Sequence, residues 1–245
     1  MRSFNRSADQ TRPITIDIGF TGNADGSVLI SFGNTKVICT AFLEEKVPGF
    51  LRNQRKGWVT AEYGMLPGAT HTRSNREAAK GKQSGRTVEI SRLIGRSLRT
   101  CINMDFLGER TVTIDCDVIQ ADGGTRTTSI TGGYIALALC LWKHRDKFSK
   151  WPLVGGVGAI SLGIVKGEVR VDLDYKEDFA AAVDLNLVMS HQGKLVEIQG
   201  TAEEAPFSVS ELMEIVKMGG NAIAEIQRLG RRTLLNEGVI ESCIP

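Results

Sequence analysis

The fold is decided by residues 111–142, TVTIDCDVIQADGGTRTTSITGGYIALALCLW, in which one hydrophobic period gives way to another. Over residues 112–118 every second residue is apolar, which predicts a strand with one buried face. Two glycines follow, and the apolar residues from Ile130 to Trp142 are then spaced as in a helix. A strand, a glycine turn and a helix therefore form the centre of the first half of the chain.

Strand patterns precede this centre along the chain. Three β-rich runs are separated by Asp25-Gly26 and Gly33-Asn34, pairs that are typical of hairpin turns. Between these runs and the centre, Arg76 to Thr100 carries apolar residues at helical spacing. The three β-rich runs are residues 15–18, 27–32 and 35–41.

The same order of patterns returns in the second half. Two hairpins are expected about Lys166-Gly167 and Gln192-Gly193, with arms at 158–165, 168–173, 183–189 and 195–199. An amphipathic helix closes the chain over residues 208–236, with Ser208 and Glu211 as a capping box. Strands followed by a helix, twice, predict an α+β domain over residues 1–245 with two similar halves, 1–150 and 151–245.

The composition is that of an ordinary globular protein, with 245 residues, 42% hydrophobic and 24% charged. Five scattered cysteines without a CxxC spacing are read as reduced core thiols. Residues 1–13 are polar, and the longest apolar run, residues 134–142, is far shorter than the roughly 20 residues of a membrane span. We therefore expect a soluble, cytoplasmic protein that does not engage a membrane.

Basic residues are concentrated in one block, although the formal net charge is only +2. Between Arg52 and Arg99 there are eleven Lys or Arg residues and three Glu residues. Such a block in a nearly neutral protein indicates a polyanionic ligand on one face. Arg73, Arg76 and neighbouring lysines lie in a loop rich in Thr, Ser and Asn, which could follow a sugar-phosphate backbone. With only 6% aromatic residues, we expect binding through the backbone of the nucleic acid rather than base stacking.

The glycine turn at residues 122–124 is the first candidate anion site. It leads into a helix, whose N-terminus presents free N–H groups at its positive end. Arg126 could clamp an anion with two hydrogen bonds, and Thr125 or Ser129 could donate from a hydroxyl. The alternative is a tight turn with N-capping hydroxyls and no ligand.

A second glycine-flanked basic turn, residues 81–87, also leads into a helix and makes Arg86 a candidate anion contact. It lacks the order of a P-loop. The alternative is a solvated turn in which Arg86 pairs with a carboxylate.

Five carboxylates fall within thirteen residues that otherwise read as two strands and a turn. Such a group could hold Mg²⁺, or one member could act as a general acid with a raised pKa. The alternative is an acidic turn in solvent. The five are Asp172, Asp174, Glu177, Asp178 and Asp184.

Long blocks in the same order resemble the ribonuclease PH family over nearly the whole chain. They include GWVTAEYGMLP (57–67), REAAKGKQ (76–83), RLIGRSLR (92–99) and DCDVIQADGGTRT (115–127). Shorter matches lie at residues 177–178, 183–186 and 197–203.

The resemblance implies a fold of two similar β-β-α halves, like domain 2 of ribosomal protein S5, and a homohexamer built as a trimer of dimers. It implies a phosphate site at Arg86, Gly124, Thr125 and Arg126. It also implies catalysis by Asp178 and Asp184, with Mg²⁺ as their cofactor. RNA binding is implied for Arg73, Arg76, Arg92, Arg96 and Arg99.

The activity implied by the resemblance is trimming of the 3′ end of precursor tRNA, with rRNA as a second candidate. Inorganic phosphate is the co-substrate, nucleoside diphosphates are released, and the reaction is reversible. The partner is RNA rather than DNA. Two alternatives remain: a non-catalytic RNA-binding ring subunit, which should lack Arg86, Arg126 or Asp184, and a small-molecule phosphotransferase, which should carry a nucleotide-binding glycine loop.

Three positions depart from the family pattern. Gly68 stands where an arginine is common, which leaves Arg73 and Arg76 to carry more of the RNA contact. Residues 3–5, Ser-Phe-Asn, replace a usual Pro-Asp-Gly, and Gly133-Tyr134 replaces smaller residues. None of these changes removes a candidate catalytic residue.

Overall fold

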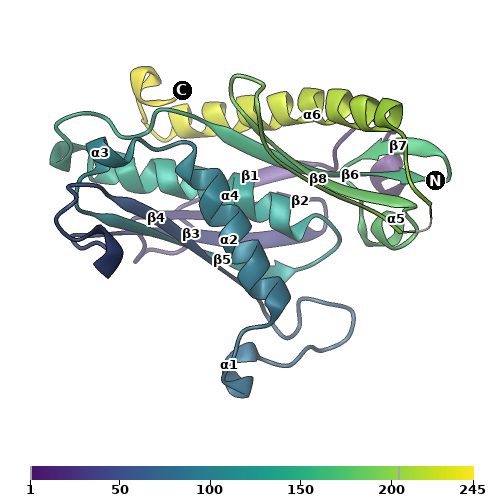
Figure 1. Ribbon diagram of the computed structural model, residues 1–245, viewed down its shortest axis with the longest axis horizontal. Helices are drawn as coiled ribbons and strands as arrows, with labels where there is room; N and C mark the ends of the chain where they lie inside the picture. The colour runs from purple at the N-terminus through teal and green to yellow at the C-terminus, as the bar shows by residue number, and fades with distance from the viewer. Residues whose placement is uncertain (1, 204) are drawn as a thin grey trace.

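Two β-sheets and the helices packed on them form the protein, which a computed structural model describes for residues 2–203 and 205–245 (Figure 1). The first sheet has the order β1-β2-β3-β5-β4 and the second β7-β6-β8-β9. Neighbouring strands are antiparallel except β4 and β5, which are parallel. The strands are β1 (Ile14–Ile18), β2 (Gly26–Phe32), β3 (Thr35–Glu44), β4 (Trp58–Met65), β5 (Thr111–Gln120), β6 (Val157–Val165), β7 (Glu168–Val171), β8 (Val183–Ser190) and β9 (Leu195–Ala202).

Long helices cover these sheets, and shorter ones lie in the connections. The helices are α1 (Glu77–Lys80), α2 (Gly85–Arg99), α3 (Met104–Leu107), α4 (Thr125–Lys143), α5 (Tyr175–Phe179) and α6 (Val209–Asn236). Four 3₁₀ turns add η1 (Ser3–Asn5), η2 (Gly49–Leu51), η3 (Arg145–Lys147) and η4 (Glu241–Cys243).

Helix α4 joins the two halves, because it packs against β2 and β3 of the first sheet and β6 of the second. Almost all of its residues are buried, which explains why its sequence is apolar around the whole circumference rather than on one stripe. Strand β6 lies between α4 and α6 and is buried at every position, so its residues do not alternate in polarity. One continuous core therefore connects the halves.

Helix α2 packs on β4 and α4, and α6 packs on β6 and β7. Both are amphipathic, and α6 begins with the expected capping box of Ser208 and Glu211. The segment that carries α1 extends away from the sheets and helices (Figure 1).

The two-sheet α+β architecture confirms the expected fold class, and the pairing of β6 with β7 and of β8 with β9 confirms both hairpins of the second half. Helix α4 starts at Thr125 rather than Ile130, because Gly124 caps it in a left-handed conformation. The helical region after Arg76 is interrupted at Gly81, which has φ +70°, and α2 begins only at Gly85.

The acidic region also differs from the expected two strands and a turn. Strand β7 ends at Val171, because Asp172 takes a left-handed φ of +58°. Helix α5 then begins with a capping box formed by Asp174 and Glu177. Strand β4, for which no periodicity was recognised, pairs with β5 along its whole length.

The cysteines lie largely as expected. All five are free thiols, and four of them are buried, whereas Cys243 is half-buried near the C-terminus.

Candidate active site

The glycine turn at residues 122–124 lies where the two sheets approach each other, and it delivers the chain into the N-terminus of α4. Gly124 is the N-cap, with φ +66°, and Gly123 has φ +76°. The first N–H groups of the 19-residue helix α4 have no intrahelical acceptor and point out of its end. The turn therefore has the geometry that suits an anion, as the sequence indicated.

Two arginines on different helices, Arg126 on α4 and Arg86 on α2, contribute positive charge near this end of α4. Arg126 is the second residue of α4, and its Nη1 donates to Gln199 Oε1 at 3.2 Å. Gln199 in turn donates to Glu89 Oε1 at 2.9 Å, which links β9 to α2. Arg86, the second residue of α2, is exposed. Both arginine charges act on the same groups, Tyr63, Asp178 and Asp184, so they share one electrostatic environment.

Thr125 and Ser129 have different surroundings. The Thr125 hydroxyl is 2.9 Å from the Tyr63 hydroxyl, so β4 helps to hold the start of α4. The Ser129 hydroxyl is fully buried and donates to the Thr125 carbonyl oxygen at 2.8 Å. Ser129 therefore stabilises the helix from inside and cannot donate to an anion at its N-terminus.

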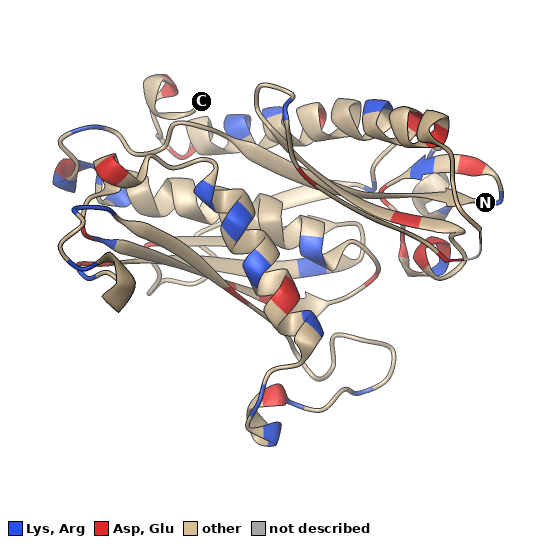
Figure 2. Cartoon of the chain, in the orientation of Figure 1, with Lys and Arg blue, Asp and Glu red and all other residues tan. Residues whose placement is uncertain are grey.

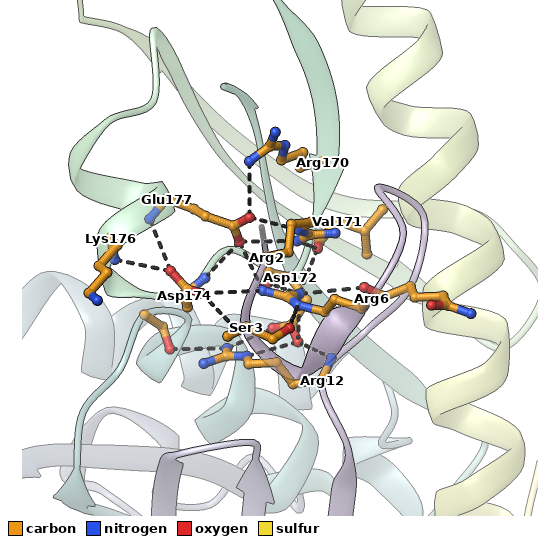
Figure 3. Close-up of polar contacts among 12 residues, drawn as sticks. Arg2, Ser3, Arg6, Arg12, Arg170, Val171, Asp172, Asp174, Lys176 and Glu177 are labelled. Carbon is orange, nitrogen blue, oxygen red and sulfur yellow. Dashed lines mark hydrogen bonds and ion pairs between the residues drawn. The ribbon is translucent and has the colours of Figure 1, made fainter. Parts of the chain in front are cut away.

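The five carboxylates divide into two sets. Asp172, Asp174 and Glu177 are buried and paired with arginines of the N-terminal segment, as Figure 3 shows. Asp178, on α5, and Asp184, on β8, make no side-chain hydrogen bond or ion pair within residues 2–203 and 205–245. In the sequence the five carboxylates form one cluster. In the fold, three of them neutralise buried arginines, and Asp178 and Asp184 are left without a partner among the described residues.

Asp178 and Asp184 are electrostatically strained. Burial raises the pKa of Asp178, and the charges of Arg126 and Arg86 offset part of that rise. Burial, followed by repulsion from Asp178, raises the pKa of Asp184 to about 6. The two arginines and two carboxylates are therefore close enough to influence one another, and one carboxyl can hold a proton near neutral pH.

The donor set of the two carboxylates fits Mg²⁺. This ion takes one or two protein carboxylates and completes its octahedron with water and phosphate oxygens. A cation beside Asp178 and Asp184 would relieve their mutual repulsion. Within the described ranges no group of three or more His, Cys, Asp or Glu side chains is placed to cage a metal, so protein ligands alone would not complete the site.

Residues 10–141 match the RNase PH model, described as the 3′ exoribonuclease family, domain 1, and residues 155–222 match domain 2 of the same family. The chain belongs to the RNase PH family of 3′ exoribonucleases. This is a family of phosphorolytic enzymes, as the resemblance of the sequence blocks indicated.

Solved structures with the same fold include a rice protein and archaeal exosomes. Rice (Oryza sativa) Rrp46 has a TM-score of 0.78 at 18% identity, with 95% of this chain and 100% of that chain covered. The Archaeoglobus fulgidus exosome with RNA bound to the active site gives 0.76 at 16%, covering 93% and 91%. An archaeal exosome core gives 0.72 at 16%, covering 92% and 89%.

The expected RNA-binding arginines of this RNase PH family member lie on two surfaces. Arg73 and Arg76 belong to the segment that extends from the body, where Arg76 lines a cavity of about 620 Å³ with Lys82 and Asp117. Arg92, Arg96 and Arg99 line a second cavity of about 350 Å³ along α2, where Figure 2 shows a row of basic residues. The structure therefore does not gather the five arginines at one point.

Two of the α2 arginines already have partners. Arg96 Nη2 is 2.7 Å from Glu197 Oε1, and the Arg99 guanidinium lies 4.5 Å from the Trp58 ring centroid. Arg99 Nη1 also donates to the Val59 carbonyl oxygen at 2.9 Å. Arg92 is exposed and is the one of the three most open to a phosphate group.

Sequence reasoning missed Tyr63, Gln199 and Arg12 as site residues. Arg12 is almost completely buried, at 1% exposure, and donates to carbonyl oxygens of the glycine turn. A single Arg near the N-terminus gives no sequence signal for such a role, because the glycine turn is more than a hundred residues away along the chain. No helix among the described residues is long and apolar enough to cross a membrane.

Proposed function

We propose that the protein is a phosphate-dependent 3′-to-5′ exoribonuclease that trims precursor tRNA, with rRNA as a second substrate, and that it is a reversible nucleotidyltransferase. The observation that carries this proposal is that Arg86 and Arg126 lie close enough to Asp178 and Asp184 for their charges to act on both carboxyls, whose pKa values are raised. An anion site beside groups that can carry a proton is what transfer of RNA to phosphate requires.

Inorganic phosphate is held by Arg86, Arg126, the hydroxyl of Thr125 and the backbone N–H groups at Gly124. The arginines offset the repulsion between this phosphate and the RNA backbone, and they stabilise the negative charge that builds up in the transition state. A phosphate oxygen forms a bond to the phosphorus of the terminal nucleotide as the bond to the preceding 3′ oxygen breaks. The products are a nucleoside diphosphate and RNA shortened by one nucleotide.

The departing 3′ oxygen needs a proton or a positive charge. The carboxyl of Asp184, with a pKa raised to about 6, can hold that proton near neutral pH and deliver it, and the pKa of Asp178 is raised in the same direction. Mg²⁺ bound by the same two residues would supply charge stabilisation to that oxygen. Because the reaction replaces one phosphoester linkage by another, the polymerisation from nucleoside diphosphates is catalysed as well.

Arg73, Arg76, Arg92, Arg96 and Arg99 are proposed to guide the RNA backbone. The archaeal exosome structures among the structural neighbours, one with RNA bound at its active site, support RNA binding as part of a larger assembly. We propose a homohexamer of three dimers that works in the cytoplasm. The alternative of a non-catalytic ring subunit predicts the loss of Arg86, Arg126 or Asp184. Retention of Arg86, Arg126, Asp178 and Asp184 favours the enzyme.

The experiment uses precursor tRNA labelled at its 3′ end, with Mg²⁺ and with or without inorganic phosphate. We expect nucleoside diphosphate only when phosphate is present, and its loss in Arg126→Ala and Asp184→Ala. Arg145→Ala is the matched control, because Arg145 lies just beyond the other end of α4, against Trp142.

Three results would contradict the proposal. Release of nucleoside monophosphate without phosphate would make the protein a hydrolase. RNA binding without release would make it a binding subunit of a ring. Equal trimming of an unrelated RNA of the same length would remove the claim of tRNA specificity.

A further inference from the structure

The N-terminal segment buries its arginines instead of exposing them to solvent. Arg6 and Arg12 are 7% and 1% exposed, and Arg2 pairs with Glu177 at 2.7 Å. A buried guanidinium is costly unless its charge and its five donors are all satisfied. The hydrogen-bond and ion-pair partners of these arginines therefore show which parts of the fold the N-terminal segment stabilises (Figure 3).

Arg12 is anchored on Asp172 by three hydrogen bonds. Its Nε and Nη2 donate to the two carboxylate oxygens at 2.9 and 2.7 Å, and its backbone N–H donates at 2.7 Å. Asp172 is in a left-handed conformation that is uncommon for a residue with a side chain. Arg12 and Asp172 thus fix each other in a strained stretch directly before α5.

The remaining donors of Arg12 reach the glycine turn. Nη1 donates to the Asp122 carbonyl oxygen, and Nη2 lies 3.4 Å from the Gly123 carbonyl oxygen. Thr35 completes the support, because its hydroxyl donates to the same Gly123 oxygen at 2.6 Å and accepts from the Asp122 N–H at 3.0 Å. The carbonyl groups of the turn are thereby held inward.

The same turn is packed directly against the chain that enters α5. A side chain on Gly123 would collide with the backbone of Leu173 and Asp174. The Asp122 carboxylate accepts from the Tyr175 N–H at 3.1 Å, at the first residue of α5. Since α5 carries Asp178, the turn and this carboxylate are joined through a few backbone contacts.

A second set of bonds fixes the other side of α5. Arg6 Nη2 is 2.8 Å from Glu177 Oε2, and Arg170 Nη1 is 3.2 Å from Glu177 Oε1. The Ser3 hydroxyl donates to Asp174 Oδ2 at 2.7 Å. These bonds hold the helix but do not reach the glycine turn, which sets Arg12 apart from the other arginines.

We propose that Arg12 is a positioning residue that, together with Asp172 and Thr35, holds the glycine turn so that the N–H groups at Gly124 and at the start of α4 face inorganic phosphate beside Asp178. The inference rests on the proposed function and assigns to the N-terminal segment a part in phosphate affinity. Arg12 itself touches neither substrate, because it lies behind the turn: Arg12 Nη2 and the buried Ser161 hydroxyl lie on the side from which a Cβ of Gly124 would project.

The test compares Arg12→Lys with wild type in phosphate-dependent trimming. A lysine keeps the positive charge next to Asp172, but one ammonium group cannot span the carboxylate and both carbonyl groups. We expect the KM for phosphate to rise by about tenfold or more, with kcat at saturating phosphate and the KM for RNA within about threefold of wild type. Thr35→Val, which removes the hydroxyl with little change in volume, should move the same constant in the same direction.

Arg170→Lys is the matched control. It weakens a bond in the same arginine cluster without a contact to the turn, so it should lower thermal stability and leave the KM for phosphate unchanged. An unchanged KM for phosphate in both Arg12→Lys and Thr35→Val overturns the inference, as does an equal rise in Arg170→Lys.

Phosphate-dependent thermal stabilisation gives a readout that does not need turnover. Wild type should be stabilised by millimolar phosphate and Arg12→Lys should need about ten times more. If wild type releases no nucleoside diphosphate but the variants still lose phosphate binding, the proposed function fails and the positioning role stands. If wild type is active and the variants bind phosphate equally well, the positioning role fails alone.

Discussion

Replacement of Asp184 by Asn should make the protein more stable and inactive. In the folded protein the pKa of this carboxyl is raised to about 6 by burial and by the nearby charge of Asp178. In the unfolded chain it returns to 3.8. At pH 8 the wild-type protein must therefore keep a charged group in an unfavourable place, and an amide of the same shape removes that cost.

The magnitude follows from the difference between the two pKa values. A rise from 3.8 to about 6 corresponds to at most about 3 kcal/mol above pH 7. Because the side chain is only partly buried, solvent reduces this to about 1–2 kcal/mol. Between pH 3.8 and 6 the folded protein retains a proton that the unfolded chain has released, so wild-type stability falls as pH rises through this window. At pH 4, at the lower end of that window, most of the difference between wild type and variant should be gone.

The assay is urea denaturation of wild type and Asp184→Asn at pH 4 and pH 8, at one protein concentration so that any assembly affects both equally. Asp146→Asn, at an exposed position in η3, is the control for the chemical change from Asp to Asn. We also expect Mg²⁺ to stabilise wild type more than Asp184→Asn, because we propose that Asp178 and Asp184 together bind the cation. A variant that is no more stable than wild type at pH 8, or a gain that persists at pH 4, would refute the reasoning.

Gly123→Ala should destabilise the protein by more than about 2 kcal/mol and abolish phosphate-dependent release, because the methyl group meets the Leu173 carbonyl oxygen and φ is +76°. Gly167→Ala has the same φ in open space and should cost only about 1 kcal/mol with activity retained, which thermal melts and the trimming assay can compare. Glu177→Ala should cost about 3–5 kcal/mol, since it leaves buried guanidinium groups unpaired. Burial acts to raise the pKa of Glu177, but the paired arginines outweigh it and the pKa is lowered. The contribution of Glu177 to folding stability is therefore present above the unfolded pKa of 4.5 and is lost as pH falls through the lower folded pKa. A loss of stability in Glu177→Ala that stays constant down to pH 2 would contradict this.

Much of the fold could be predicted because it is encoded locally. The alternating residues of β5, the hairpin turn at Lys166-Gly167 and the capping box at Ser208 each depend on a few neighbouring residues. Strand β4 was not predicted from the sequence, and neither was the start of α4 at Thr125. Both are stabilised by contacts with distant parts of the chain, since β4 pairs with β5 and Tyr63 bonds to Thr125.

The residues of the candidate site could be predicted from the sequence only as separate segments, without their arrangement in space. The sequence indicated two separate anion sites, at the turns with Arg126 and Arg86, and one acidic segment. Only the resemblance to the family implied that these segments belong to the same site. Which carboxylates were free could not be read from their spacing, because Asp172, Asp174 and Glu177 look like Asp178 until their arginines are located.

The sequence by itself determined the order of strands and helices, the chemistry of the turns and the residue types that phosphate and RNA require. The tertiary structure alone decided which charges are neutralised and which are left strained. The reason is physical: periodicity and turn chemistry act over a few residues, whereas burial and Coulomb interactions depend on distance in space. Arg12 meets Asp172 across 160 positions of the chain, and that meeting supports the turn to which we assign phosphate binding.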